Sequence, residues 1–183
     1  HPRFRIVDGQ DLKGMDLTKD ISEEEYQKKL DNYKDRIETL QNILYQKKIP
    51  VIMVYEGWDA AGKGGSIKRI ASALDPRGYS VATIAAPNEC EGSHHYLWRF
   101  WKKIPKTGHI SIYDRSWYGR VLVERVEGFC SRSEWMRAYE EINEFEASLD
   151  KWGAVIIKFW LQIDRDEQLR RFNEREDTFS KKY

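Results

Sequence analysis

One apolar segment followed by a glycine-rich turn constrains the fold of this chain more than any other feature. Val51 to Tyr55 is a continuous run rich in β-branched residues, which is typical of a strand buried on both faces. The next segment, Gly57 to Lys63, fits the pattern G-x-x-x-x-G-K, and Ile67, Ile70 and Leu74 then follow at helical spacing. A strand, a glycine-rich loop and a helix in this order predict a phosphate-binding loop, because backbone N–H groups can surround an anion where side chains are small.

The predicted loop would offer an anion both backbone donors and a positive charge. Lys63 would place its ammonium beside the β and γ phosphates. The residue after it is glycine, although Ser or Thr usually binds Mg²⁺ there, so Asp59 is the candidate for part of that role. A plain glycine-rich turn is the alternative, but strand, spacing, lysine and helix together favour the loop. The phosphate-binding candidates are Gly57, Ala60, Ala61, Gly62, Lys63, Gly64 and Gly65.

Strand-like and helical segments alternate along the 183 residues. Further strands are expected at 79–84, 110–114 and 154–163, and further helices at 94–103, 135–152 and 166–175. No hairpin signal separates the strands, so the pattern predicts an α/β fold with a parallel sheet and helices on both faces. In such sheets the ligand binds beyond the carboxyl ends of the strands.

Two capping boxes mark where long helices should begin. Ser22 with Glu25 precedes a helix that would end before Pro50, and Ser131 with Glu134 precedes the helix at 135–152. The first of these helices is expected to pack outside the sheet through one apolar face, formed by Leu30, Tyr33, Ile37, Leu40 and Leu44. We expect a single domain over residues 1–183, with an irregular leader at 1–21 and the start of a lid at about 164–183.

Composition excludes several classes of protein. The formal net charge of +1 is not a nucleic-acid footprint, because there is no excess of positive charge to release counterions. No apolar run has the length of a membrane span, and no signal peptide is visible. The two cysteines, Cys90 and Cys130, are too few for a disulfide framework and indicate reduced thiols. We therefore expect a cytoplasmic protein that binds neither nucleic acid nor membrane.

A second acidic site is predicted at the end of the third strand. Ile110 to Asp114 has the form of a Walker B strand, whose terminal carboxylate holds Mg²⁺ beside the phosphate loop. Arg115 and Arg120 follow, and guanidinium groups suit bidentate binding of phosphate. For Arg120 the alternative is an ion pair with Glu124, one helical turn further on.

The charged segment near the end of the chain resembles the start of a kinase lid. Four arginines follow the last predicted strand, and in small kinases such residues close over the phosphates and supply charge to the transition state. Arg175 is the candidate for this role. The alternative is a solvated helix face on which the arginines pair with Glu167, Glu174 and Glu176.

Two long motifs give the chain a resemblance to the family-2 polyphosphate kinases. One is Gly57 to Gly65, and the other is Asp114 to Arg120. The segments 95–101 and 121–126 are also similar, and the likeness runs from about Asp31 to Arg175. Members of the family continue past position 183, so part of the family domain is expected to be missing.

The resemblance implies a fold like thymidylate kinase and phosphoryl transfer between inorganic polyphosphate and AMP or ADP. It implies Mg²⁺, with Mn²⁺ as a possible substitute, adenine and also guanine nucleotides as substrates, and a homo-oligomer. Asp59 and Asp114 would hold metal and Lys63 would bind the transferred phosphate. Arg115, Arg120 and Arg175 would bind polyphosphate or nucleotide phosphates. The glycine after Lys63 is normal in this family.

The acceptor and the class of activity stay open at this point. The segment Ala86 to Glu89 favours AMP over ADP weakly. An ATP-dependent nucleoside monophosphate kinase and a non-catalytic nucleotide- or polyphosphate-binding domain are the alternatives. We expect direct in-line transfer, since neither His94 nor His95 is placed for phosphoryl capture.

Overall fold

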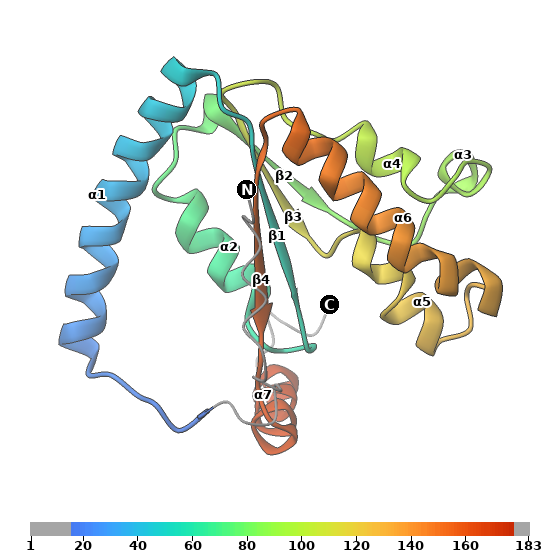
Figure 1. Cartoon of the computed structure of the whole chain (residues 1–183). Coiled ribbons are helices and arrows are strands. Elements are labelled where there is room, and N and C mark those ends of the chain that lie inside the picture. The colour runs from blue at the N-terminus through green and yellow to red at the C-terminus, as the bar shows by residue number, and fades with distance from the viewer. Residues whose placement is uncertain (1–15, 178–183) are drawn as a thin grey trace.

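A parallel sheet forms the centre of the molecule (Figure 1). The structure is a computed structural model that describes residues 16–177. Within that range four strands lie in the order β2-β3-β1-β4, and all three neighbouring pairs are parallel. The strands are β1 (Val51–Gly57), β2 (Tyr79–Thr83), β3 (Ile110–Asp114) and β4 (Val155–Leu161). The predicted parallel sheet is confirmed.

The position of β1 inside the sheet determines what surrounds its carboxyl end. Tyr55 lies beside Asp114 of β3, and Gly57 lies beside Leu161 of β4. The glycine-rich turn that leaves β1 is therefore flanked by the ends of both neighbouring strands. This is the edge where ligands bind in parallel α/β sheets.

Helices cover both faces of the sheet, as predicted (Figure 1). One face packs against α1 (Glu23–Lys47) and α2 (Lys63–Ala71) through a core that contains Ile67 and Ile112. The other face packs against α4 (Trp98–Trp101) and α6 (Arg132–Lys151), with α5 (Val123–Val126) alongside. Two cores on opposite faces make the fold a three-layer α/β/α arrangement.

Both predicted helix starts are found, but the expected apolar face of α1 is only partly buried. The Ser22 hydroxyl accepts a hydrogen bond from the Glu25 backbone N–H, and Ser131 forms a full capping box with Glu134. Ile37 and Leu44 pack against the sheet, whereas two other members of the face, Tyr33 and Leu40, are more than half exposed. The buried side chain of α1 is Gln41, which bonds both backbone groups of Asp75.

The expected helix at 94–103 is shorter than predicted. A separate turn, α3 (Glu89–Gly92), comes first, and α4 begins only at Trp98. The side chains of Ser93 and His94 both bond the Cys90 carbonyl, which closes α3 and interrupts the helical run. Local side-chain bonds of this kind are not visible in apolar periodicity.

The last described helix lies beyond the carboxyl end of β4. This helix, α7 (Arg165–Asp177), confirms the predicted charged helix, and Figure 1 shows it past the tip of the sheet. Of the expected leader, residues 16–22 form no helix or strand, and residues 1–15 lie outside the described range. No helix in the described part of the chain is long and apolar enough to cross a membrane.

Candidate active site

The turn that leaves β1 contains several left-handed backbone conformations. Gly57, Ala60 and Gly62 all have positive φ, at 140°, 64° and 99°. At Gly57 a Cβ atom would lie 2.4 Å from the Leu161 carbonyl oxygen, so only glycine fits where β1 and β4 end side by side. Gly62 then leads directly into the amino terminus of α2. The loop therefore directs the free N–H groups of that helix end toward the carboxyl edge of the sheet.

Lys63 is held against this loop. Its ammonium donates to the carbonyl oxygens of Gly57, at 2.8 Å, and Trp58, at 3.0 Å. Burial lowers the pKa of Lys63, and the neighbouring guanidinium of Arg115 adds to the effect. Three nearby carboxylates act in the opposite direction and raise this pKa, those of Asp59, Asp114 and Glu56. A partly desolvated ammonium can bind a phosphate group, and the carboxylates around it could hold a cation beside that phosphate.

The two predicted motifs meet across the end of the sheet. Arg115 follows β3, and its guanidinium lies 3.1 Å from the carboxylate of Asp59 in the phosphate loop. Its backbone N–H donates to the Tyr55 carbonyl, and its φ of 66° is left-handed. Asp114, at the end of β3, is half-buried beside β1. The structure thus brings Asp59 and Lys63 together with Asp114 and Arg115, from two segments that are far apart in the sequence.

Asp59 and Asp114 are the side chains of this site that could hold a magnesium ion. Mg²⁺ is bound in proteins by one or two carboxylates together with waters and substrate phosphates, rather than by a dedicated cage. Among residues 16–177 no group of three or more His, Cys, Asp and Glu side chains is arranged to hold a metal. Two carboxylates beside a phosphate loop match the donor set of Mg²⁺, or of Mn²⁺, completed by the substrate.

Arg120 is placed differently from the other predicted phosphate ligands. Its guanidinium pairs with Glu124 at 3.0 Å and stacks over the Tyr96 ring at 4.5 Å. The side chain is 14% exposed. The ion pair expected as the alternative is therefore present, and Arg120 stabilises the segment after Asp114 in this structure.

Arg171, and not the predicted lid residue Arg175, contacts the phosphate loop. Arg171 of α7 donates to the Ala60 carbonyl at 3.1 Å, and Gln168 of the same helix donates to the Asp59 carbonyl at 2.9 Å. Arg175 lies one turn further on with an exposed side chain. Helical spacing did not predict that Gln168 and Arg171 contact the loop. The only local signal was the i,i+4 spacing of Glu167 and Arg171, which form an ion pair on one face of α7.

A partly buried hydrogen bond beside the loop was not predicted from the sequence. The Ser116 hydroxyl donates to the carboxylate of Glu56 at 2.7 Å. Burial raises the pKa of Glu56, while the bond from Ser116 acts in the opposite direction. The sequence offered one indication of this contact. Glu56 directly precedes Gly57 and Ser116 directly follows Arg115, so both lie beside the two predicted motifs.

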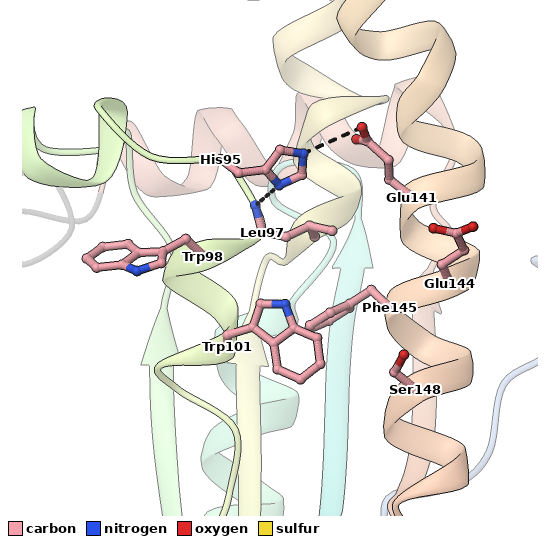
Figure 2. A pocket seen from close by; sticks show the side chains of 8 residues that line it. All are labelled: His95, Leu97, Trp98, Trp101, Glu141, Glu144, Phe145 and Ser148. Atoms are coloured by element: carbon pink, nitrogen blue, oxygen red, sulfur yellow. Dashed lines mark hydrogen bonds and ion pairs between the residues drawn. The ribbon is translucent and has the colours of Figure 1, made fainter.

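The cavity between α4 and α6 is separate from these residues. Figure 2 shows the Trp101 indole next to Phe145 of α6, the Trp98 indole directed away from α6, and His95 and Glu141 at one end. It encloses about 470 Å³. None of the predicted phosphate-site residues lines this cavity.

The fold and the loop define the class of the protein. A parallel three-layer α/β/α sheet with a glycine-rich loop between its central strand and a helix is a P-loop-kinase-like fold. Residues 20–183 match the family model described as Polyphosphate kinase 2. The chain belongs to the polyphosphate kinase 2 family.

Several relatives are similar over most of the chain. It is 52% identical to a polyphosphate:AMP phosphotransferase of Pseudomonas syringae pv. tomato over 94% of its residues and 34% of that protein. It is 58% identical to one of Acinetobacter johnsonii over 73% of its residues and 28% of that protein. Polyphosphate Kinase 2 from Arthrobacter aurescens has a solved structure that matches at a TM-score of 0.91 and 33% identity, over 97% of this chain and 66% of that one. The chain spans about a third of the length of these two phosphotransferases.

Proposed function

We propose that this chain transfers a phosphoryl group between inorganic polyphosphate and an adenine nucleotide, with AMP as the acceptor. The relatives at 52% and 58% identity are named for polyphosphate and AMP, whereas an ADP-polyphosphate phosphotransferase of Pseudomonas aeruginosa is 38% identical. The observation that carries the proposal is the convergence of Lys63, Asp59 and Arg115 at one edge of the sheet. The positive charges of Lys63 and Arg115 match the negative charges of the donor and acceptor phosphates, and Asp59 would hold Mg²⁺ beside them.

The proposed roles follow from where each group lies. The loop N–H groups and Lys63 bind the terminal phosphates of the donor, and Arg115 binds the phosphoryl group that moves. Asp59 and Asp114 would hold Mg²⁺, which would neutralise charge on the phosphates when bound. Arg171 and Arg175 of α7 supply further positive charge from the side of the phosphate loop.

The proposed transfer is direct and in line. A terminal phosphate oxygen of AMP attacks the end phosphorus of polyphosphate, the bridging P–O bond breaks, and the shortened polyphosphate leaves with the electron pair. Catalysis then consists of positioning and charge neutralisation. Acid quenching of the chain with ³²P-polyphosphate should leave no label on the protein, and a labelled phosphoenzyme would overturn this mechanism.

The substrates can be tested by supplying each donor with each acceptor. The chain is mixed with Mg²⁺, long-chain polyphosphate or ATP, and AMP or ADP, and the nucleotides are separated by chromatography. We expect ADP from polyphosphate and AMP, with EDTA abolishing the product and Mn²⁺ restoring it. Turnover with ATP alone would make the protein a conventional nucleotide kinase, and binding without turnover would make it a binding domain.

A further inference from the structure

The Glu56 carboxylate takes no part in the proposed reaction, yet it joins the two segments that do. Glu56 is the last residue before the phosphate loop, and its Oε1 accepts a hydrogen bond from the Ser116 Oγ at 2.7 Å. Ser116 is 3% exposed, and its hydroxyl also accepts from the Tyr118 backbone N–H at 3.3 Å. The partly buried bond therefore connects β1 with the turn after β3.

The residues on each side of this bond are the charged groups of the candidate site. Glu56 is followed by the loop that carries Asp59 and Lys63, and Ser116 is preceded by Arg115. A second connection lies close by, because the Arg115 N–H donates to the Tyr55 carbonyl at 3.1 Å. The turn after β3 is therefore attached to β1 by two hydrogen bonds, one from the Ser116 side chain and one from the Arg115 backbone.

The turn needs such a fixation because its backbone is strained. Arg115 has a φ of 66°, a left-handed conformation that residues other than glycine adopt only at a cost. Strained residues persist where the surrounding contacts hold them in place. The Glu56 side-chain oxygen, as an acceptor for the Ser116 hydroxyl, supplies one such contact.

We propose that Glu56 is a positioning residue that, through Ser116, sets where the Arg115 guanidinium lies relative to the phosphate loop. This inference rests on the proposed phosphoryl transfer. It predicts that the Glu56–Ser116 bond contributes to turnover and only weakly to nucleotide binding, because misplacing a group near the reacting atoms slows the chemical step.

A double-mutant cycle tests this role. Glu56→Ala and Ser116→Ala are each expected to lower kcat about 10- to 100-fold, with nucleotide KM changed less than about threefold. The double variant should be no slower than the worse single variant, because both changes remove the same contact. Glu56→Gln should stay within about threefold of the unchanged chain, since an amide oxygen still accepts from Ser116.

A matched control separates positioning from general loss of stability. Gln41→Ala also removes buried hydrogen bonds, those to Asp75, but it lies between α1 and the turn before β2, outside the site. It should lower the melting temperature and leave kcat unchanged. Additive effects of the two alanine changes, or an equal loss of kcat in the control, would overturn the proposal.

The cycle is independent of which donor the protein uses. It is measured with polyphosphate or with ATP, whichever gives product, so that failure of the polyphosphate assignment leaves the test intact. If neither donor is turned over, calorimetric titration with tripolyphosphate and Mg²⁺ replaces kcat. Shared, non-additive loss of affinity would then support the role, and additive or absent loss would overturn it.

Discussion

The carboxylate of Asp59 and the guanidinium of Arg115 lie 3.1 Å apart and connect the phosphate loop with the turn after β3. Both side chains are at least half exposed, at 65% and 50%, so the pair itself adds little to stability. Its importance lies in the proximity of the two groups. A phosphate chain that enters between them can be contacted by Arg115 while Asp59 remains available for a metal ion.

Two substitutions of Arg115 should separate its side chain from its backbone. Arg115→Ala and Arg115→Gly both remove the guanidinium, and both should lower turnover by about 100-fold or more. Because φ at this position is 66°, glycine fits the backbone better, and Arg115→Gly should be more stable than Arg115→Ala by about 1 kcal/mol. Urea unfolding measures the difference, and equal stability of the two variants would contradict the strained conformation.

Two glycines of the phosphate loop should respond in opposite ways to alanine. At Gly57 the new Cβ would meet the Leu161 backbone at 2.4 Å, so Gly57→Ala should cost about 2–4 kcal/mol of unfolding free energy. Gly64 lies in the first turn of α2 with open space around it, and Gly64→Ala should leave stability unchanged or raise it by up to about 1 kcal/mol. Chemical denaturation of both variants checks this contrast, which similar losses at the two positions would refute.

The two arginines of α7 should differ in their effect on stability. Arg171 contacts the Ala60 carbonyl and pairs with Glu167, so Arg171→Ala should loosen α7 from the phosphate loop as well as weaken polyphosphate binding. Arg175 is exposed, so Arg175→Ala should reduce turnover about tenfold or more at an unchanged melting temperature. Thermal unfolding and initial rates on both variants test this, and full activity of Arg175→Ala would remove it from the site.

The sheet could be predicted from the sequence because its strands are short, β-branched and separated by strong breaks. Val51 to Tyr55 and Ile110 to Asp114 are found as strands whose ends differ little from the predicted ones. The helix at 94–103 was predicted too long, because the bonds of Ser93 and His94 to the Cys90 carbonyl depend on side-chain geometry that periodicity does not report.

The sequence predicted the parts of the candidate site that lie in contiguous motifs, but not the contacts made by distant segments. Gly57 to Lys63 and Asp114 to Arg115 are contiguous motifs, and a parallel sheet places the ends of their strands together. Arg171 and Gln168 reach the loop only through the direction that α7 takes after β4, which no local pattern encodes. For Arg120 the local pattern indicated the ion pair with Glu124, but not the contacts with Tyr96 and Glu134, which come from distant segments.

The most direct test of the central claim compares two lysine variants in the polyphosphate reaction. Lys63→Ala removes the ammonium at the phosphate loop, and Lys151→Ala removes an exposed ammonium in the last turn of α6. With polyphosphate, AMP and Mg²⁺, we expect the unchanged chain and Lys151→Ala to form ADP at the same rate, and Lys63→Ala to form it at least about 100-fold more slowly. Equal rates for all three would contradict the assignment of phosphoryl transfer to this loop.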